Sequence, residues 1–179
     1  MDIKLGKKLK QKASNKKFAT STTNSHNFRI NGMKSFQSKS KEHCFINKYY
    51  FQKTTEEEIE SHLAYFFYDG QKVDTELIGK CMGIVKKIVF SLLSFKGGSF
   101  HSSSLLICYD GKNHASFEVK LIDFDKYIDD DKDESDHNII EGLKYIVSYL
   151  QAIIEHPHTH ENLIKGKQLK FFQEESSIP

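Results

Sequence analysis

The sequence lacks a hydrophobic run long enough to cross a membrane, and its lysine-rich N-terminus lacks the apolar stretch of a secretory signal. We therefore expect neither a membrane-spanning helix nor a signal peptide. Tryptophan is absent, but 14 Phe and 8 Tyr contribute to a hydrophobic content of 38%. These residues suffice for a core, which excludes a wholly disordered chain. A length of 179 residues corresponds to about one domain.

Cysteine is also scarce, and it occurs only at Cys44, Cys81 and Cys108. The odd number and the wide spacing match neither a zinc site nor a redox motif. We therefore expect reduced thiols, as in a protein of the cytoplasm or the nucleus. The cysteines therefore indicate little about the function.

The net charge of +2 conceals two parts of opposite sign. Residues 1–53 contain 13 of the 26 Lys and Arg residues and only two acids, which gives +11. Residues 54–179 contain the other 13 bases and 22 acids, which gives −9. Such polarity indicates a basic surface and an acidic site that serve one purpose. A domain with a basic tail is the alternative.

Apolar spacing predicts strands and helices without βαβ alternation, which indicates an α+β fold. The predicted strands cover residues 1–6, 28–36, 45–51, 103–109 and 117–124, the last two joined by a hairpin turn. The predicted helices cover residues 55–69, 74–95 and 137–155, and the first of them starts with a capping box. Loops are expected at residues 19–27, 37–43 and 129–136.

Asp123 is the acid that most suggests a site, because it ends an apolar strand and precedes Phe124. A carboxylate held at a sheet edge and buried there needs a cation or hydrogen-bond donors. A magnesium ion completed by substrate phosphates would meet that need. An aspartate that ends the strand by capping a turn is the other interpretation.

Asp2 and Lys4 share one face of the first strand, because side chains alternate along a strand. A carboxylate can orient or deprotonate an attacking hydroxyl, and a neighbouring ammonium can neutralise a phosphoryl group. Taken alone, however, a D-x-K-x-G string is weak evidence, since it occurs by chance on many strands.

A dense cluster of lysines follows the first strand. Ammonium groups bind phosphates, so the target could be a nucleic acid or a small polyphosphate. The cluster has no interleaved aromatics, and we expect no specific nucleic-acid binding. A solvated basic tail is the alternative. The cluster consists of Lys8, Lys10, Lys12, Lys16 and Lys17.

Three histidines near the C-terminus could bind a metal ion. We interpret them as surface residues, because no acid or cysteine lies at ligand spacing. They are His156, His158 and His160.

Taken in order, these segments resemble the inositol polyphosphate kinase family. The motifs are D-x-K-x-G at 2–6, F-R-I-N-G-M at 28–33, N-K-Y-Y at 47–50, S-S-S-L-L at 102–106 and I-D-F at 122–124. The N-K-Y-Y segment and the three-serine form of S-S-S-L-L look most similar to the inositol hexakisphosphate kinase branch. The resemblance extends from Asp2 to about Ile154, and several ordered motifs are far more specific than any single one.

The resemblance implies an ATP-dependent kinase that uses Mg²⁺ and transfers a phosphoryl group to an inositol polyphosphate. It implies that residues 1–155 form the C-terminal lobe of a protein-kinase-like fold, with antiparallel strands and packed helices. Within this lobe, residues 7–27 would be a basic substrate-binding insert, and residues 156–179 would be a C-terminal tail.

The family's site residues carry over to matching positions. Asp2 would be the catalytic base or would position the acceptor hydroxyl, and Lys4 would bind the substrate or the transferred phosphoryl group. Asp123 would bind the magnesium ion, and Ser104 and Leu106 would lie near the nucleotide. The insert would bind substrate phosphates through Lys8, Lys12, Lys16 and Lys17.

The sequence also departs from the family pattern. It starts directly before D-x-K-x-G, so the proline of the signature and the smaller, ATP-covering lobe are missing. The insert is short, and Phe51-Gln52 stands where the pattern has Gly-Arg. We expect a truncated kinase; a non-catalytic module that binds inositol polyphosphates is the alternative. Nucleic-acid binding through residues 4–17 is a third hypothesis.

Overall fold

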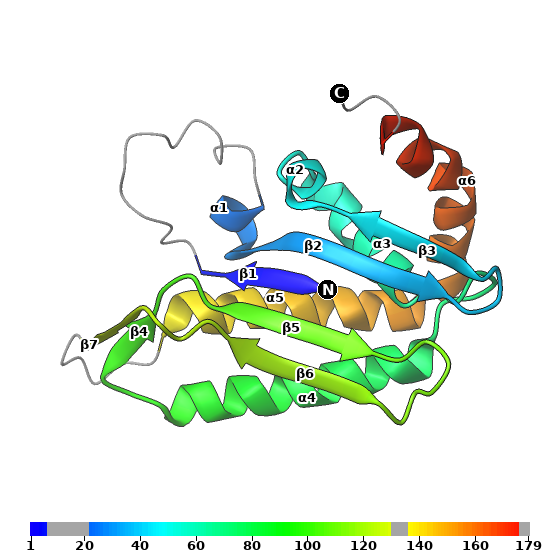
Figure 1. The fold of residues 1–179 in the computed structure, drawn as a ribbon. Helices are drawn as coiled ribbons and strands as arrows, with labels where there is room; N and C mark the ends of the chain where they lie inside the picture. The colour runs from blue at the N-terminus through cyan, green and yellow to red at the C-terminus, as the bar shows by residue number, and fades with distance from the viewer. Residues whose placement is uncertain (7–21, 130–135, 176–179) are drawn as a thin grey trace.

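A five-stranded antiparallel sheet organises the computed structural model, which describes residues 1–6, 22–129 and 136–175, with side chains described as far as residue 166 (Figure 1). The strands lie in the order β3-β2-β1-β5-β6. They are β1 (Asp2–Leu5), β2 (Phe28–Gln37), β3 (Glu42–Ile46), β5 (Ser104–Tyr109) and β6 (Phe117–Ile122). A separate two-stranded sheet pairs β4 (Gly98–Phe100) with β7 (Tyr127–Asp129).

Helices cover one face of the large sheet and leave the other face open (Figure 1). The long helices α4 and α5 pack against each other, and α5 also contacts β1 and β2. This arrangement confirms the predicted α+β class of antiparallel strands with packed helices. The helices are α1 (Thr23–His26), α2 (Lys48–Phe51), α3 (Glu56–Phe66), α4 (Thr75–Ser94), α5 (His137–Glu155) and α6 (Pro157–Glu175).

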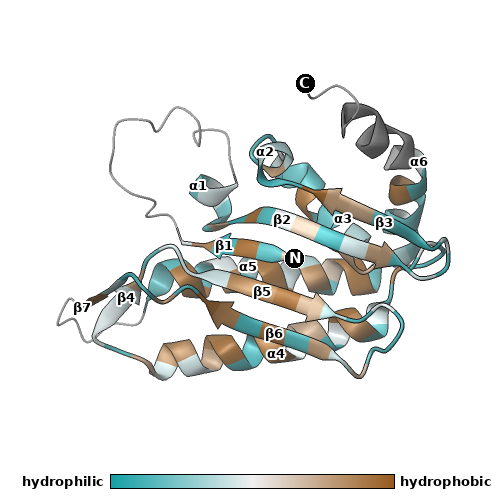
Figure 2. Cartoon of the chain, in the orientation of Figure 1, coloured by the Kyte–Doolittle hydropathy of each residue, from teal (hydrophilic) through white to brown (hydrophobic). Residues whose placement is uncertain are grey.

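The core lies between the sheet and these helices. On β1, Ile3 and Leu5 are 0% and 1% exposed, as the alternation of the first residues predicts. Hydrophobic residues fill most of β5, which lies beside β1 (Figure 2). The face of α5 that packs inward contributes the buried residues Ile139, Leu143, Ile146, Leu150 and Ile153.

Side-chain caps start the three helices that the sequence predicts. Thr55 and Glu58 form the predicted capping box of α3, in which the Thr55 amide donates to Glu58 Oε2 over 2.9 Å. Asp74 accepts from the Leu77 amide at the start of α4, and Asp136 caps α5. The predicted hairpin of β5 and β6 is also present, with Tyr109 paired to Phe117.

The predicted strand at residues 45–51 is wrong beyond Ile46, because a helical turn replaces it. Asn47 ends the extended segment, and its Oδ1 accepts from the amides of Tyr49 and Tyr50 over 2.9 and 3.2 Å. This side chain satisfies amides that a strand would leave unpaired at this edge, so α2 forms. Its last residue, Phe51, is 2% exposed and anchors the turn in the core.

The expected loop at residues 19–27 contains the short helix α1 in its described part. Asn27 ends this helix in the left-handed region, with φ 57°, a conformation that asparagine tolerates better than most residues. Inside the fold, the His26 ring contacts the Tyr149 hydroxyl over 2.8 Å. The turn after α1 is therefore fixed against α5.

The interpretation of His160 as a surface residue is wrong. The segment after Pro157 is the helix α6, which starts with proline at a position where proline is favoured. His160 is 5% exposed, and Ile164, one turn later, is 2% exposed, because this side of α6 packs on α3. His160 Nε2 lies 3.6 Å from Glu60 of that helix.

Several sequence expectations fall outside the described residues. These include the lysine segment of residues 7–17 and most of the acidic stretch at 129–136. Over the described ranges, no helix combines the length and the hydropathy needed to cross a bilayer.

Gly142 of α5 lies directly against the backbone of Asn27, which is hydrogen-bonded to the residue after β1. The Asn27 carbonyl accepts from the Gly6 amide over 2.7 Å, directly after β1. A Cβ at Gly142 would lie 2.6 Å from that same carbonyl oxygen. Only glycine allows α5 to approach so closely, since the neighbouring atom belongs to backbone that cannot move aside.

We therefore expect Gly142→Ala to destabilise the protein by about 1–3 kcal/mol, because the added methyl overpacks this contact. Chemical denaturation measures the effect. The matched control is Gly79→Ala in α4, where nothing lies within 4 Å of the added Cβ. There alanine should stabilise by about 0.5–1 kcal/mol, since it favours the helix. Equal effects of the two substitutions would contradict the packing argument.

Candidate functional site

Asp2 and Lys4 lie on the open face of the sheet, opposite the helices. In the strand register Asp2 is paired with Leu106 of β5, and Lys4 is paired with Ser104. Residues paired directly across antiparallel strands share a face, so these four positions form one group. The predicted common face of Asp2 and Lys4 is therefore what the structure has.

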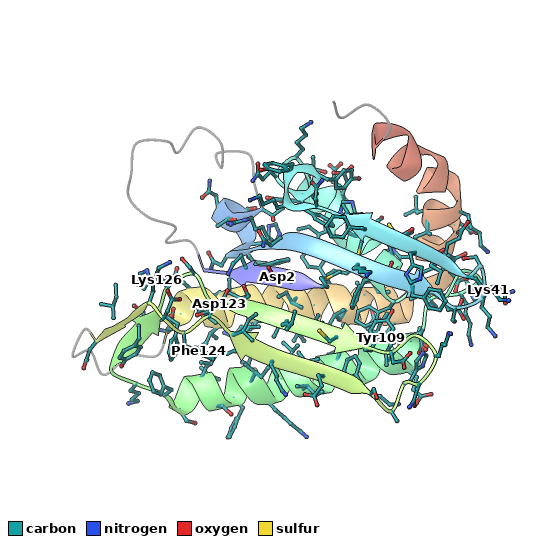
Figure 3. All side chains as sticks on the ribbon, in the orientation of Figure 1. Asp2, Lys41, Tyr109, Asp123, Phe124 and Lys126 are labelled. Carbon is teal, nitrogen blue, oxygen red and sulfur yellow. The ribbon has the colours of Figure 1, made fainter. Side chains whose placement is uncertain are left out.

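Asp123 follows β6 at the end of the sheet where β5 begins (Figure 3). Its φ of 65° lies in the left-handed region, which is unusual for a residue other than glycine. The Ser103 hydroxyl donates to the Asp123 carbonyl over 3.2 Å, and the Ser104 hydroxyl donates to Oδ2 over 3.5 Å. The carboxylate is 47% exposed, so the expectation of a buried charge is wrong, although its position at a sheet edge is right.

Lys4 joins β1 to the residue that follows β6. Its ammonium forms an ion pair with Asp123 Oδ2 and donates to the Ser102 carbonyl over 3.1 Å. The hydrogen bond and the charge of Lys4 hold the pKa of Asp123 below its usual value. Because Lys4 pairs with Ser104, and Ser104 with Ile122, the register brings two residues 119 positions apart into contact.

Asp2 has a partner that the sequence analysis missed. The Asn31 side-chain amide donates to Asp2 Oδ2 over 2.7 Å. The other oxygen, Oδ1, is buried and has no hydrogen-bond partner among the described residues. The signal that could have found it is strand alternation, because a regular register continued from the Lys4–Arg29 pair places Asn31 opposite Asp2.

Arg29 is a second missed residue. It is paired with Lys4 across β1 and β2, and its Nη1 donates to the Thr23 hydroxyl over 3.3 Å. Burial lowers the pKa of Arg29, and the charge of Asp2 raises it. The guanidinium stays charged, because even a lowered arginine pKa is far above neutrality. It adds a second cation to this face.

The remaining predicted site residues have different outcomes. Ser104 is buried beside Asp123, and Leu106 is half-buried opposite Asp2, so both belong to the same face. Their role near a nucleotide stays a prediction. The substrate-binding lysines predicted in the insert, Lys8, Lys12, Lys16 and Lys17, lie outside the described residues.

The oxygen atoms of this group fit a magnesium ion. Across the described residues, no cluster of three or more His, Cys, Asp or Glu side chains could hold a metal. Magnesium needs no such cluster, since it is commonly held by one or two carboxylates and completed by water and substrate phosphates. The half-exposed Asp123 carboxylate beside the Ser104 hydroxyl meets that description.

The arrangement suits the handling of phosphate groups. It combines a carboxylate with one buried oxygen that has no partner among the described residues, two cations, and a second carboxylate that is half-exposed. Transfer of a phosphoryl group requires alignment and charge compensation more than covalent participation by the protein.

Comparisons with known proteins also point to a protein that acts on phosphate groups. A family model described as inositol polyphosphate kinase matches residues 1–151. Inositol hexakisphosphate kinase 2 of Homo sapiens is 31% identical over 120 residues, which are 63% of this chain and 28% of that protein. The enzyme of the same name from Oryctolagus cuniculus is 28% identical over 145 residues, or 75% and 34%. The chain thus spans about a third of the length of these curated relatives.

Solved structures establish the fold. An inositol phosphate multikinase structure superposes with a TM-score of 0.75 at 20% identity, covering 86% of this chain and 78% of that one. Inositol phosphate multikinase Ipk2 from S. cerevisiae, in complex with ADP and Mn²⁺, gives 0.72 at 23% identity, covering 86% and 77%. The predicted kinase-like fold is thereby confirmed.

The Lys4–Asp123 pair leads to a titration prediction. Replacing Lys4 by Met should raise the pKa of Asp123 towards its ordinary value, because the largest cause of its lowering is removed. The carboxyl ¹³C shift of Asp123, followed against pH, measures this. Since the folded pKa is lowered, the pair's contribution to stability is present above the ordinary pKa and is lost as pH falls through the folded value.

Lys126→Met is the matched control for this titration. Lys126 also lowers the pKa of Asp123, but its charge is the smallest cause, so its removal should shift the titration much less. An unchanged Asp123 titration in Lys4→Met would contradict the ion pair.

Proposed function

The chain belongs to the inositol polyphosphate kinase family, whose model matches residues 1–151, and from this premise we propose that the protein is an ATP-dependent kinase that transfers a phosphoryl group to an inositol polyphosphate. The observation that carries the proposal is the contact of Lys4 with Asp123 on the open face of the sheet, where Asp2 lies two positions along the same strand as Lys4. Lys4 and Asp123 are 119 positions apart in the chain. Phosphoryl transfer requires both signs of charge at one place.

Asp2 is the proposed partner of the acceptor hydroxyl. Asn31 occupies Oδ2, so Oδ1 is left to orient the hydroxyl or accept its proton. A carboxylate fixed on the central strand holds its position closely, and alignment of the reacting groups lowers the barrier. This supports Asp2 as base or as positioner, in agreement with the family motif.

Lys4 and Asp123 are the proposed charge-compensating groups. When bound, Mg²⁺ supplies positive charge to the phosphate oxygens, and Asp123 is the residue that would hold it. Lys4 then provides an ammonium for a phosphate of the substrate. The ion pair holds the Lys4 ammonium and the Asp123 carboxylate next to each other on the open face of the sheet.

The acceptor that we propose is inositol hexakisphosphate or a close relative. Its support is the group of relatives named inositol hexakisphosphate kinases and the resemblance of the N-K-Y-Y and three-serine segments to that branch. A substrate with many phosphates also suits a chain whose first 53 residues carry a charge of +11.

The cytoplasm or the nucleus, or both, is the location that we propose. The three cysteines are free thiols, with Cys44 and Cys81 buried and Cys108 exposed, which suits a reducing compartment. Imaging of a tagged protein at its natural expression level tests this proposal.

The test of the proposed function uses the full-length protein with Mg²⁺, ATP and inositol hexakisphosphate, and follows the phosphorylated product. Asp123→Asn should reduce kcat at least about 100-fold, because a metal-holding charge is lost, without changing Tm by much. The control is Asp125→Asn, an exposed aspartate two positions away whose carboxylate lies 4.0 Å from Lys126. This control should retain activity.

Each outcome decides between the two functions under consideration. A wild-type protein that binds inositol hexakisphosphate but transfers no phosphoryl group would replace the kinase by the non-catalytic binding module. Undiminished turnover of Asp123→Asn would contradict the metal-holding role of that residue.

A further inference from the structure

We infer that Asn31 is a positioning residue, which fixes the Asp2 carboxylate through Oδ2 and leaves Oδ1 as the oxygen without a partner, for the acceptor hydroxyl. The inference rests on the proposed function and goes beyond it, because it assigns a role to a residue outside the family's motif positions. In F-R-I-N-G-M, the fourth position is the one that the family pattern leaves open.

Asn31 lies beside Asp2 at a break in the strand pairing. On β2, Gly32 is paired with Asp2 and Ile30 with Ile3, so Asn31 is an extra residue with no partner on β1. The burial pattern of β2 breaks at the same point. Residues three positions apart in a regular strand lie on opposite faces, but Ile30 and Met33 are both buried. This is a β-bulge, a feature that redirects a side chain and is frequent next to active sites.

The hydrogen bond of Asn31 fixes the rotation of the carboxylate. At 2.7 Å, the amide of Asn31 donates to Oδ2, and a carboxylate bonded at one oxygen cannot rotate freely about its Cβ–Cγ bond. The amide is neutral, so it orients Asp2 without adding a charge that would compete for the base. A lysine or arginine at this position would form an ion pair with the same carboxylate.

The second carboxylate oxygen of Asp2, Oδ1, indicates why the carboxylate is held in this orientation. Oδ1 is buried and has no partner among the described side chains and backbone groups, although a buried carboxylate oxygen normally accepts a hydrogen bond. Lys4 does not serve it, because the ammonium is engaged by Asp123 and the Ser102 carbonyl. An acceptor hydroxyl would supply the missing donor.

The experiment measures kcat and KM of the full-length protein for inositol hexakisphosphate in three variants of Asn31. Asn31→Ala removes the donor, and the nearly isosteric Asn31→Asp replaces it with a like charge. Both should lower kcat at least about tenfold, within the range that a general base contributes, while KM changes less than about twofold. Asn31→Gln keeps an amide and should recover part of kcat.

Asn113→Ala is the matched control, since the Asn113 side chain accepts from the Ala115 amide over 3.1 Å in the β5–β6 turn. It removes a comparable side-chain hydrogen bond and should leave kcat unchanged. Tm is measured for every variant. If Asn31→Ala lowers Tm strongly, Asn31→Asp, which keeps the size of the side chain, decides the question.

Three results would overturn the inference. One is an unchanged kcat in Asn31→Ala and Asn31→Asp with an active wild type, which leaves the proposed function intact. Another is a raised KM with unchanged kcat, which would assign Asn31 to substrate binding. The third is a wild type without any transfer, which removes the proposed function and this inference together.

Discussion

The position of β1 between two distant strands is the constraint on which the rest of the structure depends. This four-residue strand pairs with β2 on one side and with β5, about a hundred residues later in the chain, on the other. Closing so long a loop costs entropy, and the burial of Ile3 and Leu5 against the helices offsets that cost. The backbone after the strand is fixed as well, because Gly6 donates to Asn27. Asp2 and Lys4 therefore stand on a rigid element.

The ion pair of Lys4 and Asp123 is better explained by function than by stability. Its carboxylate is 47% exposed, and exposed pairs contribute little to the free energy of unfolding. The surrounding backbone even opposes the arrangement, since Ser102 and Asp123 both have φ of 65°, and such conformations cost about 1–3 kcal/mol each. A structure that maintains strain at this point gains a fixed placement of opposite charges.

Sequence reasoning succeeded where local patterns decide the structure. The helices α3, α4 and α5 follow from apolar spacing and capping, and the β5–β6 hairpin follows from its turn residues. It failed where a single side chain or a distant partner decides. Asn47 ends a strand by capping α2, and His160 is buried only because α6 packs on α3. Asn31 donates to Asp2 from another strand 29 positions later in the chain, and no period-two pattern predicts the extra residue in their pairing.

The charge asymmetry of the sequence acquires a structural basis in three dimensions. Residues 1–53 and 54–179 carry opposite net charges, which indicates a basic surface and an acidic site that serve one purpose. Because β1 is inserted beside β5, Lys4 of the basic part pairs with Asp123 of the acidic part. The two signs therefore meet within one site. A reaction that must hold a polyanion and a metal side by side requires such a meeting, and separate surfaces would not provide it.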